Sequence, residues 1–382
     1  MTIGALLFWV ALFQANPVAA LERSVGNGIR EGVYPGAVVV IGTKDTVLWS
    51  RGYGHFTWSP ASAVPDPDST LFDLASLTKV VATTTAAMLL VQEGRLDLDR
   101  ALQSYLPEFA GPGKDRVTVR HLLEHRTGLR AFLPLNRVTE SAEEARTRVL
   151  AEPLRLDPGG QVVYSDLNAM LLGWVVELVA EMPLDRYVEE RLFRPMGMLN
   201  TRFRPPRTLR PRIMPVGLWR GQAIAGEVHD QNAARLDGVA GHAGLYSTGH
   251  GLARFAQTLL RGGVTPGGDE LFAPGVVRHF TRRGSGNRAL GWEMRDTTTA
   301  EQTGSSLSAA AFGHGGFTGT SIWIDPDGDL FVILLTNRVF APRTRSSITK
   351  LKRVRGELAD QAVQLRHEWC RARSAAETDR CE

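Results

Sequence analysis

Residues 71–92 read LFDLASLTKVVATTTAAMLLVQ, and this segment sets the expected architecture of the chain. From Ser76 to Gln92 it contains no Gly or Pro and is apolar on most sides, which predicts a helix buried at the centre of the molecule. Gly94 is placed to end that helix as a C-terminal cap. The rest of the fold must therefore be built around residues 76–92.

Strand patterns lie toward both ends of the chain, and helical patterns fill its middle. We expect an α/β protein of the α+β type, in which an antiparallel sheet built from both chain ends is covered by the first and last helical stretches, with an inserted helical subdomain. The expected strands are 37–42, 46–54, 290–295, 319–324 and 330–336, and the expected helices are 76–92, 117–125, 141–152, 166–181, 184–193, 253–261 and 346–369.

These patterns predict one domain at 21–370 and a tail at 371–382. The sheet part covers about 25–72 and 235–369, and the helical part covers about 73–234. The site is expected where the two parts meet.

The N-terminal residues have the character of an export signal. Residues 3–13 (IGALLFWVALF) are purely apolar, and small residues follow at Val18 and Ala20, although no Lys or Arg precedes the run. About eleven apolar residues are too few to span a bilayer. We therefore expect a signal peptide at 1–20, cleavage after Ala20, and a periplasmic or secreted product.

Composition excludes several function classes. The 382 residues carry a net charge of +4, and the Lys and Arg residues are scattered except between Arg343 and Arg355. Because no aromatic residues interleave with that cluster, we interpret it as a solvated helix face and expect no nucleic-acid partner. Two cysteines, Cys370 and Cys381, are too few for a thiolate zinc site, and they either pair or stay reduced.

Ser76 and Lys79 form an S-x-x-K pattern at the start of the central helix, where residues three apart lie on one face. A serine hydroxyl needs a base to become a nucleophile. We expect burial to lower the pKa of Lys79 so that it can act as that base. A second copy, Ser347 to Lys350, falls in the basic cluster, where exposure would leave its lysine protonated and idle.

Two downstream segments supply further candidate groups. Tyr164 follows a Pro-Gly-Gly turn at the start of another helix and could relay a proton between the serine and a leaving group. His314-Gly315-Gly316 precedes a strand, and adjacent glycines allow backbone to approach a substrate closely. The following N–H, from Phe317, could complete an oxyanion hole.

Together these segments resemble the superfamily of serine β-lactamases, penicillin-binding proteins and esterases, closest to its class C β-lactamase-like branch. The resemblance covers about residues 25–369. It implies that Ser76 is the acylated nucleophile, that Lys79 and Tyr164 handle protons, that His314 lines the strand edge, and that no metal or organic cofactor takes part. The matching motifs are LFDLASLTKVVATT (71–84), VRHLLEHRTGL (119–129), YSDLN (164–168), GVAGHAGLYST (238–248) and GHGGFTGT (313–320).

Two departures from the family pattern bear on the substrate. Asp166 stands where the family often has Asn. His314-Gly315-Gly316 stands where the family often has Lys-Thr-Gly. Both departures resemble the esterase and peptidase-like branches of the family. Gly316, Phe317 and Asp166 are the candidate oxyanion or substrate-binding residues. We expect a serine hydrolase that acts on a small ester or a peptide-like amide, with ester favoured. The alternatives are a β-lactamase, a D-alanyl-D-alanine carboxypeptidase, or a non-catalytic penicillin-binding sensor.

Two further histidine patterns have alternative interpretations. His121 and His125 match the zinc-peptidase pattern H-x-x-E-H, with a third ligand to come from Glu143, Glu144 or Glu152. The same stretch fits the serine-hydrolase resemblance, which we favour. His229-Asp230 and His242 either form a hydrogen-bonded pair near the site or stabilise loops.

Overall fold

The computed structural model describes residues 16–299 and 301–375. Its main sheet has six strands in the order β2-β1-β11-β10-β9-β8, with antiparallel neighbours throughout. β1 pairs with β11 so that Val38 lies opposite Leu335, which confirms the predicted sheet built from both chain ends. The strands are β1 (Gly36–Gly42), β2 (Val47–Gly54), β8 (Glu293–Met294), β9 (Phe312–Gly315), β10 (Ser321–Asp325) and β11 (Leu330–Thr336).

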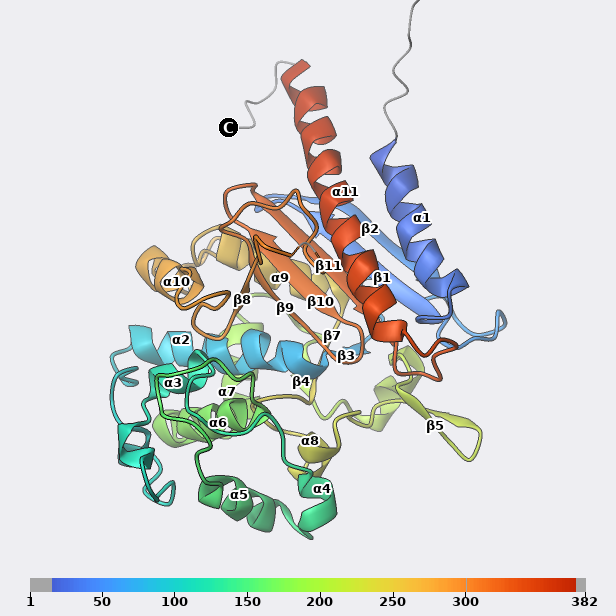
Figure 1. The fold of residues 1–382 in the computed structure, drawn as a ribbon. Helices are drawn as coiled ribbons and strands as arrows, with labels where there is room; N and C mark the ends of the chain where they lie inside the picture. Colours follow the sequence, from blue (N-terminus) through green and yellow to red (C-terminus); the bar gives the residue numbers. More distant parts are fainter. Residues whose placement is uncertain (1–15, 300, 376–382) are drawn as a thin grey trace, which may run out of the picture.

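One face of the sheet is covered by helices from the two ends of the chain. α1 (Pro17–Arg30) and α11 (Ser347–Ala375) lie side by side across it (Figure 1). Alternate strand residues such as Val39 and Val332 face these helices, because successive side chains of a strand point to opposite faces. The sequence patterns predicted α11 but not α1.

The opposite face of the sheet joins the larger hydrophobic core. α9 (Gly249–Leu260) packs on β1, β10 and β11, and the neighbouring strand residues Val38 and Ile333 belong to this core. We expected the helix at 76–92 to cover the sheet; α9 does so instead. The 76–92 segment lies one layer deeper, between the sheet and the helical part (Figure 1).

The central segment is buried, as predicted, but it is not one regular α-helix. A 3₁₀ turn at Ala75–Leu77 is followed by a π-helical stretch at Lys79–Thr84 and by α2 (Thr85–Gln92). π-Helical stretches are rare and are often found at functional sites. Among the described residues, Ala75–Gln92 is the one straight helical stretch apolar enough to cross a membrane, and 83% of it is buried in the protein core.

Most of the remaining helices form a lobe below the sheet, and short strands lie at its edges (Figure 1). The elements are α3 (Val119–Leu123), α4 (Leu135–Val138), α5 (Ala142–Ala151), α6 (Asp166–Ala180), α7 (Leu184–Val188) with a π-helical continuation to Phe193, α8 (Gln231–Arg235), α10 (Pro274–Thr281), β3 (Phe72–Asp73), β4 (Arg202–Phe203), β5 (Gly217–Trp219), β6 (Gln222–Ile224) and β7 (Leu245–Ser247). The helices predicted at 141–152, 166–181 and 184–193 are found within one residue of their bounds, the one predicted at 117–125 ends at Leu123, and α4, α8 and α10 were not predicted.

The two chain ends bear on the export and cysteine predictions. Residues 1–15 of the predicted signal peptide lie outside the described residues, and cleavage after Ala20 would remove the first turn of α1. The deeper contacts of α1, made by Leu21 and Val25, lie beyond that cut. Cys370 is disulfide-bonded, while Cys381 lies outside the described residues.

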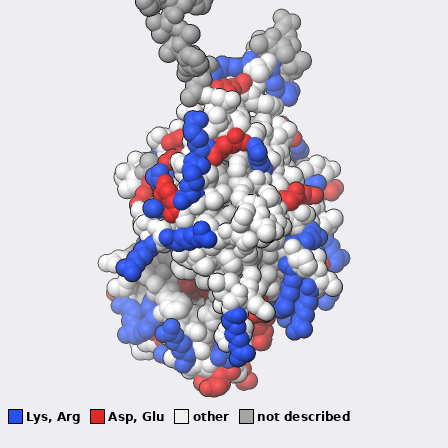
Figure 2. Space-filling view, turned by 90° about the vertical axis from the view of Figure 1, so that its right-hand side faces the viewer, with Lys and Arg blue, Asp and Glu red and all other residues white. Residues whose placement is uncertain are grey.

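Surface charges of both signs are interspersed. On the face drawn in Figure 2, Lys and Arg lie among Asp and Glu and broad uncharged areas. In the basic cluster near the start of α11, Lys350 and Arg353 pair with Glu31, and Lys352 pairs with Glu301. Each of these three cations has an acidic partner, so this part of the cluster does not form a continuous positive surface.

Candidate active site

The candidate nucleophile lies on a strained turn. β3 leads into the turn, and Ala75 adopts a left-handed backbone conformation with φ of 47°, which is unfavourable for a residue with a side chain. The N–H of Ala75 donates to Asp73 Oδ1 over 2.8 Å. This conformation places the following residue, Ser76, in the wall of a cavity.

Lys79 contacts Ser76 as the i, i+3 spacing predicted. Its Nζ lies 3.0 Å from Ser76 Oγ, 3.1 Å from the carbonyl oxygen of His242 and 2.7 Å from Asp166 Oδ1. Only 3% of Lys79 is exposed.

The expected lowering of the Lys79 pKa is wrong. Burial does act to lower the pKa of Lys79, but the nearby charge of Asp166, and after it Tyr164, outweigh burial and raise the pKa above its ordinary value. Lys79 is therefore an ammonium group that donates to Ser76, and another group must accept the serine proton.

Asp166 is the first residue of α6, so its carboxylate lies at the helix N-terminus, where negative charge is favourable. Burial acts to raise its pKa, but the ammonium of Lys79 outweighs burial and holds the pKa below its usual range. Asp166 also lines the cavity. Its closest partner is Lys79, which adds an ion-pair role to the substrate-binding role expected from sequence.

Tyr164 lies among the other polar groups of the site. The Lys79 ammonium is 5.0 Å from the centre of its ring, and the Arg288 guanidinium is 5.3 Å from it. The rings of His125 and His314 lie 4.8 Å and 5.7 Å from the Tyr164 ring, centre to centre. The three sequence motifs therefore meet around this tyrosine.

His125 supports Tyr164 and does not belong to a zinc site of the expected form. α3 ends at Leu123, and His125 has a φ of 56°, so it does not share a helix face with His121. Its Nδ1 accepts the N–H of Ser165 over 3.1 Å. Burial lowers the pKa of His125 well below the ordinary value, which keeps the ring neutral for that contact. Within the described residues, no three His, Cys, Asp or Glu side chains gather as metal ligands do.

His314 lies on β9 and is buried. Its Nδ1–H donates to the carbonyl oxygen of Gly315 over 2.9 Å, so Nε2 carries the lone pair. Burial lowers the pKa of His314 to about 4. The residue at the first position of the third motif is therefore uncharged at neutral pH.

The turn after β9 places Phe317 beside the nucleophile turn. The hydroxyls of Thr318 and Thr320 donate to the backbone carbonyls of Asp73 and Leu74 over 2.7 and 3.0 Å. The N–H of Phe317 has no acceptor among the described residues, as an oxyanion donor requires.

Gly316 does not supply an oxyanion donor, because its N–H already donates to the carbonyl oxygen of Thr320 over 2.7 Å. Its contribution is the absence of a side chain. A Cβ at Gly316 would lie 2.6 Å from the carbonyl oxygen of Leu74. The glycine thus permits the close approach between the two turns.

The cavity at Ser76 has a volume of about 520 Å³. Two aromatic side chains, Phe132 and Phe317, stand at it and remain 51% and 60% exposed. Exposed rings beside a nucleophile offer apolar contact to a bound acyl group. The complete lining is Ser76, Phe132, Pro134, Asn136, Arg137, Tyr164, Asp166, His229, Asp230, Gln231, Asn232 and Phe317.

His242 and Asp230 form the hydrogen-bonded pair that the sequence left open. Asp230 Oδ1 lies 3.0 Å from His242 Nε2 and also caps α8. The backbone carbonyl of His242 accepts from Lys79. The pair therefore both stabilises its loop and helps to hold Lys79.

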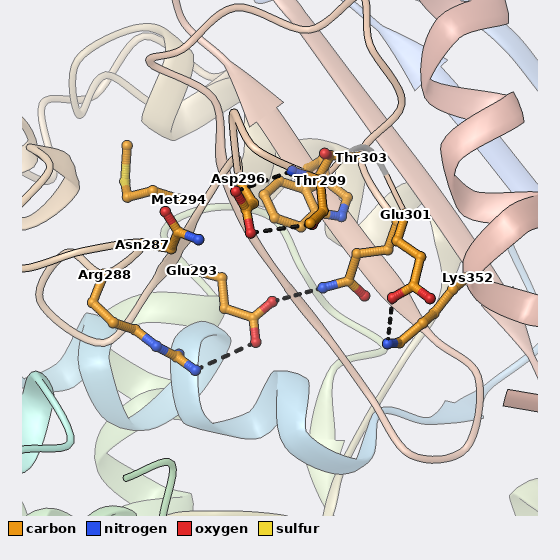
Figure 3. A pocket seen from close by; sticks show the side chains of 11 residues that line it. Asn287, Arg288, Glu293, Met294, Asp296, Thr299, Glu301, Thr303 and Lys352 are labelled. Carbon is orange, nitrogen blue, oxygen red and sulfur yellow. Dashed lines mark hydrogen bonds and ion pairs between the residues drawn. The ribbon is translucent and has the colours of Figure 1, made fainter. Parts of the chain in front are cut away.

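A second cavity of about 280 Å³ lies along β8, and Arg288 forms part of its wall (Figure 3). Its acidic groups already have partners. Arg288 Nη2 lies 3.6 Å from Glu293 Oε1, and Lys352 Nζ lies 2.7 Å from Glu301 Oε2. This cavity adds no candidate nucleophile to the site, and Arg288 links its wall to Tyr164.

Sequence reasoning missed the supporting residues His125, Asp73 and Arg288. His125 lies in the quoted stretch 119–129, so its place in that motif was the available signal. From the sequence it was considered individually only as a possible zinc ligand. Asp73 directly precedes the nucleophile turn and lies within the quoted motif 71–84, but no role was assigned to it from the sequence. The chain offered no local signal for Arg288.

A protein-family model described as Beta-lactamase matches residues 21–356. A curated relative from Salmonella agona, provisionally named D-alanyl-D-alanine carboxypeptidase, is 31% identical over 86% of this chain and 84% of its own length.

Solved structures with the same fold include a penicillin-binding protein homologue from Caulobacter crescentus (TM-score 0.73, 21% identical, 91% of this chain and 98% of that one). EstCE1, a hydrolase with promiscuous acyltransferase activity, gives a TM-score of 0.70 at 22% identity, over 90% of this chain and 98% of that one. Simvastatin synthase (LovD) from Aspergillus terreus gives 0.68 at 20% identity, over 91% and 98%.

Proposed function

Because this chain belongs to the beta-lactamase family, whose members are serine hydrolases, we propose that it hydrolyses small, uncharged acyl esters through an acyl-Ser76 intermediate. The observation that carries the proposal is the third motif. His314 is neutral at physiological pH, and Gly315 has no hydroxyl group. A substrate carboxylate would therefore lack the cation and the hydroxyl that a Lys-Thr-Gly motif supplies. An uncharged ester needs neither of these groups.

We propose that acylation uses these polar groups in the following way. In this proposal Tyr164 is the base that takes the proton from Ser76 Oγ, and Oγ attacks the ester carbonyl carbon. The ammonium of Lys79, 3.0 Å from Oγ, stabilises the negative charge that develops on the serine oxygen. The N–H groups of Ser76 and Phe317 donate hydrogen bonds to the carbonyl oxyanion. Tyr164 then gives its proton to the leaving alkoxide, and the C–O bond breaks.

Deacylation repeats these steps with water. Tyr164 removes a proton from a water molecule, and the resulting hydroxide attacks the acyl carbon. When the tetrahedral intermediate collapses, the carboxylic acid leaves and Tyr164 returns the proton to Ser76 Oγ. The ammonium of Lys79 keeps its charge throughout, held by Asp166 2.7 Å away.

The test compares kcat/KM for p-nitrophenyl butyrate with kcat/KM for a chromogenic cephalosporin. Losing a hydrogen bond to a charged group costs about 1.5–3 kcal/mol, or roughly 10- to 150-fold in carboxylate recognition. We expect the ester value to exceed the cephalosporin value by at least that factor. A cephalosporin value equal to or above the ester value refutes the substrate preference. Acylation by both compounds without turnover would instead support a non-catalytic sensor.

A second candidate activity is D-alanyl-D-alanine carboxypeptidase, the provisional name of the Salmonella relative. Arg137 favours it, because its exposed guanidinium lines the cavity and has no acidic partner among the described residues. A peptide carboxylate could bind there. If this activity is the true one, a D-Ala-D-Ala peptide will be cleaved faster than the ester, and Arg137→Ala will raise KM for the peptide but not for the ester.

We further propose that the protein acts outside the cytoplasm after removal of residues 1–20. The support is the apolar run at 3–13 followed by small residues up to Ala20. N-terminal sequencing of protein from the cell envelope should find Leu21 first. A retained Met1 contradicts the cleavage.

A further inference from the structure

The buried carboxylate of Asp73 contacts three segments of the site. Its Oδ1 accepts the N–H of Ala75 over 2.8 Å, and its Oδ2 accepts the N–H of His229 over 2.8 Å. Its backbone carbonyl accepts the hydroxyl of Thr318 over 2.7 Å. Asp73 thus joins the nucleophile turn, the cavity loop at His229 and the turn that carries Phe317.

Asp73 has no cationic partner among the described residues, and only 2% of it is exposed. Burying a carboxylate without a counter-charge costs free energy, so its hydrogen bonds must offset that cost. The role of the carboxylate visible here is local. Both oxygens accept backbone N–H groups, and one of these belongs to Ala75, whose φ of 47° is strained.

We propose that Asp73 is a positioning residue whose ionised carboxylate holds the Ser76 turn in its reactive conformation and in register with the cavity loop. A protonated carboxyl would turn one oxygen into a donor facing an N–H group, and one of the two contacts would be lost. The turn would then relax away from the strained conformation at Ala75, and the Ser76 hydroxyl would move relative to Lys79. The proposal rests on the proposed role of Ser76 as nucleophile.

This role makes acylation sensitive to pH. Burial raises the pKa of Asp73 to about 6, although the two backbone N–H groups act to lower it. The charged or titratable groups that face it are Asp230, Tyr246 and His229. An acid with a raised pKa ionises as pH rises through that value, so acylation should increase as pH passes upward through about 6. His314 titrates lower, near 4.

The experiment measures the rate of Ser76 labelling by a fluorophosphonate from about pH 5 to about pH 9. The wild type should show an acid limb near pH 6. Asp73→Asn cannot accept both N–H groups, so labelling at neutral pH should fall about 10- to 100-fold and the acid limb should disappear. An Asp73→Asn variant that keeps the limb, or that loses less than about threefold, overturns the proposal.

Asp325 provides a matched control, because it is also 2% exposed and its carboxylate also accepts two backbone N–H groups, from Ser308 and Gly328. Asp325→Asn should lower stability without altering the acid limb. An equal change of the limb in both variants would show a general structural effect and would contradict the proposal.

Ala75→Gly tests the same idea with Asp73 intact, and it is useful if Asp73→Asn does not fold. Glycine adopts a φ near 47° without strain, so the turn should no longer depend on the carboxylate. The acid limb should flatten in Ala75→Gly, and an unchanged limb overturns the proposal. If the wild type is not labelled at Ser76 at all, the proposed function fails instead.

Discussion

Two S-x-x-K stretches, residues 76–79 and 347–350, share a sequence pattern but have different surroundings. Ser76 Oγ lies 3.0 Å from Lys79 Nζ, whereas Ser347 Oγ accepts from Arg338 Nη1 over 3.0 Å. Lys79 is 4% exposed at its side chain and pairs with Asp166, whereas Lys350 is 32% exposed at its side chain and pairs with Glu31. The chemistry of the pattern therefore depends on what packs around it. Only the first copy combines a buried lysine with a serine that contacts this lysine and lines the site cavity.

The strongest test of this difference removes each serine in turn. Ser76→Ala should lower kcat/KM for an ester by at least about 10⁴-fold, as loss of a nucleophile does, and should abolish covalent labelling in intact-mass spectra. Ser347→Ala should keep both. Labelling that survives in Ser76→Ala, or that disappears in Ser347→Ala, would reverse the assignment of the two copies.

The next largest effect concerns the lysines. Lys79→Ala should lower kcat/KM by at least about 10²-fold, the scale of proton-transfer and charge effects, while Lys350→Ala should leave it unchanged. Tyr164→Phe should cost as much as Lys79→Ala. The double variant should be little worse than either single variant, because groups that act as a unit are not additive. Losses that multiply would contradict a shared proton path.

The acidic partners give a smaller, pH-dependent contrast. Asp166→Asn should lower kcat/KM about tenfold and move the basic limb of the profile to lower pH, because Asp166 is what raises the pKa of Lys79. In the wild type the pKa of Asp166 is lowered, so the stability from this ion pair is present above the usual carboxyl pKa and is lost as pH falls through the lowered one.

Glu31→Gln is the matched control, since Glu31 is the partner of Lys350. Measured over the same pH range, it should leave both limbs of the kcat/KM profile in place. A basic limb that stays fixed in Asp166→Asn would contradict the assigned cause of the raised Lys79 pKa.

The smallest expected effect is structural. Ser347→Ala leaves Arg338 Nη1, which is buried, without its acceptor and should lower the free energy of unfolding by about 1–2 kcal/mol. Urea unfolding should show this loss while kcat/KM stays within about twofold of the wild type. Full stability in this variant would show that the Ser347 to Arg338 contact contributes nothing measurable.

Much of the fold could be predicted from local sequence patterns. The strand predicted at 330–336 has those bounds, because a continuous apolar run is what a fully buried strand requires. The helix α1 was missed because its first four residues overlap the predicted export signal and the rest contains Gly26 and Gly28, which have low helix propensity. The π-helical stretch at Lys79–Thr84 depends on tertiary contacts, and its residues carry no local signal for it.

The site was predictable as a set of residues but not in its charges. Ser76, Lys79, Tyr164 and His314 come together as the motifs predicted. The sign of the Lys79 pKa shift was wrong because sequence spacing did not place a carboxylate 2.7 Å from its ammonium. Burial alone and burial with a counter-charge have opposite effects on a lysine.

The pairing of β1 with β11 governs when the protein can fold. Val38 finds its partner Leu335 about 300 residues later, so the chain must close a very long loop to complete its sheet. Until β11 has been synthesised, the edge of β1 that β11 later covers is unpaired, and other chains can aggregate on such an edge. Folding therefore follows synthesis of nearly the whole chain, and any truncation before Leu330 leaves β1 without its central neighbour.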